Sequence, residues 1–274
     1  MPKNCPSGQM YTAMYRGPDT PIENIPEWAP EYCKGIRVMI RYSELQKSLA
    51  FCRALAEKGY SVFIQPSVTA RYTEEEIQTL IRAANEMQAY ALYFVDTYGY
   101  LQPQDIRDFF RRYDANLDAS VRIGFHAHNN QMLALPNALE FLTIHTERQL
   151  ILDACLLGFG QGAGNLQTEI ITNYMNVHNN AHYEYGAVLD GCEIMESFCG
   201  RGMSGYSVTQ LLPALHRTAY RYSVALRDGY GLTYREIDRI LKRIPEELRH
   251  RYTPEHTVQL LTLCGYPVQE AQAK

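Results

Sequence analysis

The chain has 274 residues, 46% of them hydrophobic and 20% charged, which is the composition of an ordinary globular protein. Its formal net charge of −4 comes without a basic stripe, which argues against nucleic-acid binding. No apolar run reaches the roughly 18 residues of a membrane span, and the N-terminus lacks the apolar core of a signal peptide. The seven cysteines are scattered without a Cys-x-x-Cys pair, so we expect reduced thiols in a cytoplasmic protein.

Six short apolar segments favour β-strands, and amphipathic helical segments alternate with them. The predicted strands are Gln9–Tyr15, Ile36–Ile40, Tyr60–Ile64, Ala91–Val95, Val121–Phe125 and Gln149–Leu156. From the second strand onward they begin roughly every 30 residues, which is the length of one βα unit. This alternation predicts an α/β fold in which helices cover a parallel sheet.

The helices between the strands carry start signals. Ser43 with Gln46, and Thr73 with Glu76, have the spacing of a capping box, in which each residue bonds the backbone of the other. A later helix is expected to begin near Asn165.

The pattern changes after residue 178, where helical segments follow one another and no strand is predicted. The expected helices are Ala187–Phe198, Ser207–Leu226, Thr233–Arg243 and Pro254–Leu263. We therefore divide the chain into a barrel-type region, residues 1–180, and a C-terminal helical region, residues 181–274. The Arg-Asp pair within Leu226–Gly229 resembles a catalytic pair, but its helical surroundings favour a helix–helix turn.

Two histidines lie at the end of the strand that leads into Phe125–Asn130. His126 and His128 are two residues apart, so on a strand both side chains project to the same face. They lie at the carboxyl end of the strand, where α/β enzymes place their sites. Two imidazoles in this position suit a divalent metal. A pair of histidines that only form hydrogen bonds is the alternative.

A glycine-rich segment, Gly158–Asn165, lies between a strand and a helix. It matches the Gly-x-Gly-x-x-Ala fingerprint of dinucleotide-binding folds, but it follows several βα units instead of opening the fold, and no suitable acidic strand end follows it. We interpret it as a loop whose backbone approaches a ligand closely. Asn165 is a candidate site residue, with a plain helix N-cap as the alternative.

The strand before Val95–Gly99 ends in Asp96 and Thr97. Side chains at this end of an α/β barrel strand face the pocket, but Asp and Thr are also common turn residues. The two interpretations have equal weight.

These strand-end motifs, in this order, resemble the hydroxymethylglutaryl-CoA lyase-like family, and in particular its 4-hydroxy-2-oxovalerate aldolases. The segments that carry the resemblance are Gly59–Pro66, Val95–Gly99, Gly124–Asn130, Leu152–Cys155, Gly158–Asn165, Thr168–Glu169 and Ile240–Glu247. The resemblance implies a metal-dependent (β/α)8 TIM barrel that makes or breaks a carbon–carbon bond beside a 2-oxo acid.

The resemblance also implies roles for individual residues. His126 and His128 match the metal ligands of the family, and Asn165 matches a position that binds or neighbours the metal. Thr97, beside Asp96, matches a position that contacts the 2-oxo acid. The implied cofactor is a divalent cation (Mn, Mg or Zn), which would stabilise a pyruvate enolate as a Lewis acid.

The chain departs from the family at its N-terminal side. The family begins with a strand that carries an Asp-Arg-Asp-Gly motif, with a catalytic arginine and a metal-binding aspartate, and a second strand follows. Neither is present, so the six predicted strands correspond to strands three to eight of an incomplete barrel with a C-terminal helical appendage, and the catalytic residues remain unknown. Such a sheet exposes two edges.

Three explanations fit this departure: an incomplete reading of a longer gene, which we favour; a second copy or partner chain that completes the barrel; or a paralogue with a binding role. The leading hypothesis is a metal-dependent aldolase or lyase, inactive or weakly active as this chain. The alternatives are a non-catalytic binding or regulatory protein and an acyl-CoA condensing synthase of the same superfamily.

Overall fold

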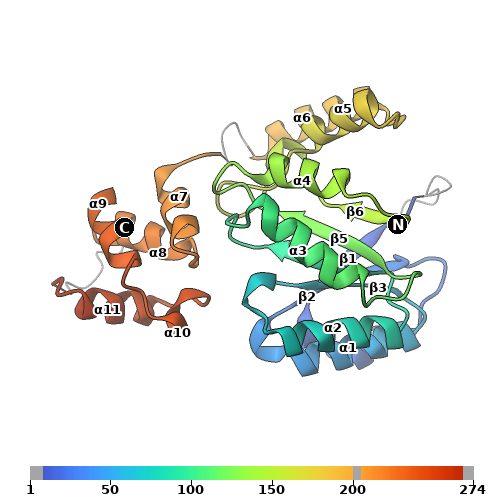
Figure 1. Ribbon diagram of the computed structural model, residues 1–274, viewed down its shortest axis with the longest axis horizontal. Helices are drawn as coiled ribbons and strands as arrows, with labels where there is room; N and C mark the ends of the chain where they lie inside the picture. The colour runs from blue at the N-terminus through green and yellow to red at the C-terminus, as the bar shows by residue number, and fades with distance from the viewer. Residues whose placement is uncertain (1–8, 200–204, 268–274) are drawn as a thin grey trace. The chain divides into compact units, whose positions relative to one another are not determined.

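The computed structural model of the chain describes residues 9–199 and 205–267 (Figure 1). Contacts divide these residues into two compact units. The first unit contains residues 9–97, 103–126 and 140–153, and it holds the sheet. The second unit contains residues 98–102, 127–139 and the described residues from 154 onward. The expected division of the chain at residue 180 stays a prediction.

Six strands form one sheet in sequential order, as the alternating pattern predicts. The strands are β1 (Thr12–Arg16), β2 (Gly35–Ile40), β3 (Ser61–Pro66), β4 (Ala91–Asp96), β5 (Arg122–Ala127) and β6 (Leu150–Leu152). The pairings of β1 with β2, β2 with β3, β3 with β4 and β5 with β6 are parallel. The predicted fold class, an α/β incomplete barrel, is confirmed.

Helices cover one face of the sheet (Figure 1). The helices of this region are α1 (Leu45–Glu57), α2 (Glu74–Glu86), α3 (Pro103–Asp114) and α4 (Ala134–Thr143). Helix α1 packs against β2 and β3, and α2 packs against β4. From the middle of β4, Phe94 contacts Phe109 and Tyr113 of α3. One set of alternate side chains in β2 to β5 is thereby buried under helices, and the other set forms the inner face of the sheet.

The two predicted capping boxes have different outcomes. Thr73 and Glu76 form the expected reciprocal bonds at the start of α2. The prediction at Ser43 is wrong, because this residue lies in a short 3-10 turn and α1 begins two residues later without a side-chain cap. The carboxylate of Glu44 beside it pairs instead with Arg41.

Gly124 lets an aromatic ring lie flat across the inner face. A β-carbon at Gly124 would lie 2.5 Å from ring atoms of Tyr93 on the neighbouring strand. Tyr93 is 1% exposed and packs in a small apolar cluster with Phe63, Ala91 and Val95. The absence of a side chain at Gly124 therefore places the Tyr93 hydroxyl group.

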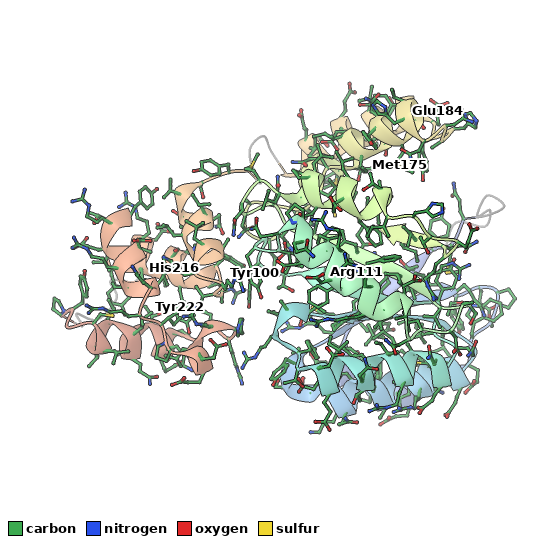
Figure 2. All side chains as sticks on the ribbon, viewed as in Figure 1. Tyr100, Arg111, Met175, Glu184, His216 and Tyr222 are labelled. Carbon is green, nitrogen blue, oxygen red and sulfur yellow. The ribbon has the colours of Figure 1, made fainter. Side chains whose placement is uncertain are left out.

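Beyond residue 152, the described residues add no strand to this sheet. The helical elements there are α5 (Thr168–His178), α6 (Tyr185–Cys199), α7 (Val208–Leu215), α8 (Arg221–Val224), the π-helical turn Ala225–Gly229, α9 (Tyr234–Leu241), α10 (Glu246–Arg249) and α11 (Pro254–Leu263). Helices α7 to α11 surround their own apolar core, in which Tyr222 is fully buried and donates a hydrogen bond to the Leu248 carbonyl group (Figure 2).

The single long helix expected over Ser207–Leu226 is wrong. Helix α7 ends before Arg217, whose φ of 50° places it in the left-handed region, and the Thr218 amide donates to the Pro213 carbonyl group. This closure is a common helix end, but glycine usually occupies the left-handed position. The Arg-Asp pair within Leu226–Gly229 lies in the π-helical turn between helices. Leu226, beside it, belongs to the apolar core of the helical region.

Strands β1 and β6 occupy the two ends of the sheet order, so among residues 9–199 and 205–267 each has a neighbouring strand on one side only. Met14 of β1 is 60% exposed, although its neighbours Ala13 and Tyr15 are half-buried. The exposed Met14 agrees with the expectation of an uncovered edge at this end of the sheet. No helix in the described ranges has both the length and the apolar character needed to cross a membrane.

We predict that Gly124→Ala lowers the free energy of unfolding by about 1–3 kcal/mol, since the new methyl group would overlap the Tyr93 ring in a packed region. Urea titration followed by circular dichroism measures this loss. Gly229→Ala is the matched control, because a β-carbon there meets no atom within 4 Å. Equal stability of the two variants would contradict the packing argument.

Candidate functional site

A buried carboxylate gathers side chains from four strands of the first unit. Asp153 follows β6, and its side chain is 10% exposed. It pairs with Arg37 of β2 and lies 2.9 Å from the Nδ1 atom of His126 on β5. Gln65 of β3 donates its Nε2 to Asp153 at 3.3 Å, and the Tyr93 hydroxyl of β4 donates at 3.3 Å. The inner face of the sheet thus has a polar centre around one acid.

Burial and neighbouring charges set the protonation states of Asp153 and Tyr93. Burial would raise the pKa of Asp153, but the hydrogen bond from His126 and the charge of Arg37 outweigh it and hold that pKa below its ordinary value. Burial raises the pKa of Tyr93, and the neighbouring Asp153 charge raises it further. Asp153 is therefore ionised and accepts hydrogen bonds only, while Tyr93 remains a neutral donor.

His126 is the only member of this cluster among the predicted site residues. The other four, Arg37, Gln65, Tyr93 and Asp153, were missed. Asp153 lies in one of the segments that carry the family resemblance, and it directly follows a strand; this position was the available signal. The remaining three sit within strands, where a sequence pattern does not distinguish a site residue from a packed one.

His128 and Asn165 lie side by side in the second unit. The two residues form an antiparallel β-bridge. On either side of it, the Asn129 amide donates to the Gly164 carbonyl group at 2.8 Å, and the Leu166 amide donates to the Ala127 carbonyl group at 3.2 Å. The backbone therefore brings together two of the residues that the sequence nominates as metal ligands.

The glycine-rich loop holds the Asn165 side chain in one orientation. A β-carbon at Gly160 would lie 2.3 Å from the Asn165 Nδ2 atom, so only glycine lets the loop pass this close. Nδ2 donates to the Phe159 carbonyl group at 2.9 Å and to the Cys155 sulfur at 3.3 Å. The Oδ1 atom is buried and has no hydrogen-bond partner. A buried amide oxygen without a partner is costly, and a ligand would satisfy it.

The N-cap alternative for Asn165 is wrong. Helix α5 begins at Thr168, and Gln167 occupies the cap position without a side-chain bond. The expected helix start near Asn165 is thus three residues early. The Asn165 amide instead donates to the Gly158 carbonyl group at 2.8 Å, so the residue belongs to the loop.

The ligand atoms that His126, His128 and Asn165 carry are of types that bind a divalent cation, but these residues alone do not make a complete coordination shell. Imidazole nitrogens and an amide oxygen are both metal-ligand types, and the orphaned Asn165 Oδ1 has the chemistry of a ligand. Within the described ranges, no group of three or more His, Cys, Asp or Glu side chains is arranged to hold a metal ion. Any metal held here would need further ligands.

Asp96 and Thr97 end β4 in the first unit. Asp96 is 2% exposed, and by strand alternation it shares a face with Phe94, which packs against α3. The Thr97 hydroxyl accepts a hydrogen bond from the Val68 amide at 2.6 Å. Thr97 thus supports the turn after β3, and the proposed contact with a 2-oxo acid stays a prediction.

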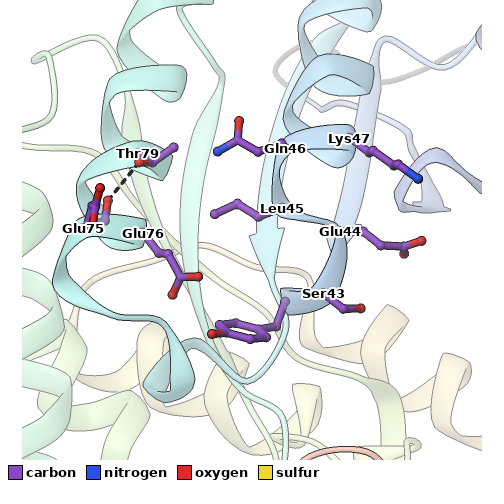
Figure 3. Close-up of a pocket in the computed structure, with 9 residues that line it drawn as sticks. Ser43, Glu44, Leu45, Gln46, Lys47, Glu75, Glu76 and Thr79 are labelled. Atoms are coloured by element: carbon purple, nitrogen blue, oxygen red, sulfur yellow. Dashed lines mark hydrogen bonds between the residues drawn. The ribbon is translucent and has the colours of Figure 1, made fainter.

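A separate pocket of about 430 Å³ opens between the first turns of α1 and α2 (Figure 3). Its lining includes Glu44, Lys47, Glu75, Glu76 and Thr79. Glu76 is occupied by its capping bond, and Glu44 by its ion pair with a neighbouring arginine. None of the predicted site residues lines this pocket.

Comparison with known proteins gives a family. The HMGL-like family matches residues 37–196, which is more than half of the chain. An oxaloacetate decarboxylase from Mycobacterium tuberculosis is 31% identical over 150 residues, covering 55% of this chain and 43% of the relative. A 4-hydroxy-2-oxovalerate aldolase from Burkholderia pseudomallei is 40% identical over 143 residues, covering 51% of this chain and 39% of the relative. The chain thus spans less than half the length of these curated relatives.

Solved structures show the same fold at low sequence identity. The N-terminal domain of a candidate aldolase from Bacteroides vulgatus superposes with a TM-score of 0.73 at 18% identity, covering 85% of this chain and 76% of that domain. The HMG-CoA lyase of Bacillus subtilis gives a TM-score of 0.60 at 19% identity, covering 72% of each chain.

We predict that Gly160→Ala displaces the Asn165 side chain, since the added methyl group would overlap its amide nitrogen. Unfolding measurements should show a loss of about 1–3 kcal/mol, and the side-chain amide signals of Asn165 should shift in ¹H–¹⁵N NMR spectra. Gly205→Ala, where a β-carbon meets nothing within 4 Å, is the control. Unchanged Asn165 signals in Gly160→Ala would refute the role of the loop.

Proposed function

We propose that this chain, which belongs to the HMGL-like family, is a carbon–carbon lyase that acts on a 2-oxo acid. Relatives named as an oxaloacetate decarboxylase and as 4-hydroxy-2-oxovalerate aldolases support this reaction class. The observation that carries the proposal is the buried, unpartnered Asn165 Oδ1 beside His128, because it marks a place built to receive a ligand.

His126, His128 and Asn165 would hold a divalent cation, either Mn, Mg or Zn. The support for the two histidines is their spacing of two residues in the sequence, where β5 (Arg122–Ala127) ends, together with the family resemblance of this segment. The support for Asn165 is the orientation that the glycine-rich loop imposes on it. When bound, such a cation acts as a Lewis acid and stabilises negative charge that develops on the oxygens of the substrate.

The remaining residues would bind and orient the acid. Thr97 and Asp96 at the end of β4 are proposed to contact the substrate. The arginine and the base that the resemblance places on the first strand of the family have no assigned counterpart in residues 9–199 and 205–267. We therefore expect weak activity from this chain unless a second chain supplies these groups.

The free edges of the sheet support a partner that completes the barrel. In the part of the chain that the structure describes, β1 and β6 each lack a neighbouring strand on one side, and β1 exposes Met14. Unpaired strand edges tend to associate with another strand. The proposed partner is a second copy of this chain or a separate polypeptide.

One observation favours a non-catalytic binding or regulatory role as a second candidate. No complete group of metal-binding His, Cys, Asp and Glu side chains occurs in the part of the chain that the structure describes. An acyl-CoA condensing synthase would use the same ligands as the lyase, so only the products of pyruvate with aldehydes or with acyl-CoA separate those two activities.

We predict that the metal-stripped protein binds Mn²⁺ and that His126→Ala or His128→Ala weakens binding at least about tenfold, since each removes a ligand. Isothermal titration calorimetry measures the affinity. Pyruvate release from oxaloacetate and from a 4-hydroxy-2-oxo acid measures the activity of the same samples.

His145→Ala is the matched control, because His145 is exposed on the loop after α4. It should leave the affinity unchanged. A wild-type protein that binds no Mn²⁺, Mg²⁺ or Zn²⁺ would exclude the metal-dependent lyase and favour the binding role.

We also predict that the purified chain associates through its β1 edge, and that Met14→Lys shifts it toward the monomer by placing a charge on that edge. Light scattering after size-exclusion chromatography gives the molar mass of each. Tyr234→Lys, at a 40% exposed tyrosine in α9, tests whether any added charge has the same effect. A wild-type monomer across the micromolar range would exclude self-association.

A further inference from the structure

We propose that Asp153 is a positioning residue that fixes both the ring orientation and the tautomer of His126, so that Nε2 carries the lone pair. The inference rests on the proposed function in one respect only, which is that His126 binds a metal. The arrangement of Asp153 itself follows from its contacts and can be tested without a metal.

The tautomer follows from the chemistry of the two partners. The Asp153 carboxylate forms an ion pair with Arg37, and an ionised carboxylate has only acceptor atoms. The Nδ1 atom of His126 lies 2.9 Å from Asp153 Oδ2, which is hydrogen-bond distance. Nδ1 must therefore carry the proton. In the neutral imidazole this leaves the lone pair on Nε2, the nitrogen on the opposite side of the ring.

The ring orientation follows from the crowding around the same oxygen. Arg37, Gln65 and His126 all approach Asp153 Oδ2, and the Tyr93 hydroxyl lies 3.3 Å from Oδ1. A flip of the His126 ring would put a C–H group against Oδ2 and lose a bond in a buried place. Since the donors come from four strands, the carboxylate itself cannot move to follow the ring.

This arrangement prepares the histidine as a ligand. A metal-binding histidine commonly donates its other ring N–H to a carboxylate, which fixes the ring and raises its basicity. Loss of such a partner typically lowers metal affinity by 10–100-fold. Arg37 keeps the carboxylate ionised, so the pair would remain an acceptor for His126 whether or not a cation is present.

The test begins with the metal-free wild-type protein. Long-range ¹H–¹⁵N correlation spectra at pH 8 distinguish the two neutral tautomers, and the absence of one set of signals in His126→Gln assigns the ring. We expect a protonated Nδ1 and an unprotonated Nε2. A wild-type ring protonated on Nε2 would overturn the proposal, and this outcome does not depend on the Asp153 variant.

Variants then separate positioning from general structure. Asp153→Leu removes the acceptor, so His126 should lose its preference for the Nδ1-protonated tautomer and bind Mn²⁺ about 10–100-fold more weakly. Tyr93→Phe removes another donor to the same carboxylate and should leave the tautomer unchanged. An unchanged tautomer in Asp153→Leu would overturn the proposal. Absence of Mn²⁺ binding by the wild type, with the expected tautomer, would instead remove the proposed function and leave the positioning role.

Discussion

The sheet of this protein depends on one buried charge. Removing a carboxylate from water is costly unless it is paired and hydrogen-bonded, and Asp153 meets this condition only with donors from four different strands. A slip of one residue in any of these strands would turn its donor to the helix-covered face. The register of β2 to β5 and the polar centre of the inner face are therefore set by the same contacts. The glycine at position 124 belongs to this arrangement, because it makes room for the tyrosine ring that reaches the carboxylate.

Much of the fold follows from local signals in the sequence. The period of the βα units and the Thr73 capping box correspond to local physics, and the structure confirms both. The errors arise where one local interaction replaces another that the sequence pattern favours. At Ser43 an ion pair next to the cap position replaces the expected capping bond. At Arg217 a non-glycine residue takes a left-handed conformation and divides a helix, and no residue type announces this end.

Some residues of the candidate site carry a local sequence signal, and others do not. The sequence nominates the two histidines and Asn165 because strand spacing and the glycine-rich loop mark them. Asp153 and Arg37 were not, because their contact joins residues 116 positions apart in the chain. The sequence alone also does not explain why position 160 needs a glycine. The reason is the close approach of its backbone to the Asn165 side-chain amide. Contacts of this kind exist only after the chain has folded.

The open edge at β1 has a consequence for the strength of the charges on the inner face. Water in contact with the exposed Met14 side chain raises the dielectric constant beside it and weakens electrostatic interactions that lie nearby. A strand added along β1 would cover Met14 and remove that water. The attraction between Asp153 and Arg37, which pairs in register with Met14, would then act in a drier medium. Assembly would in this way change the chemistry of the protein without moving any of its residues.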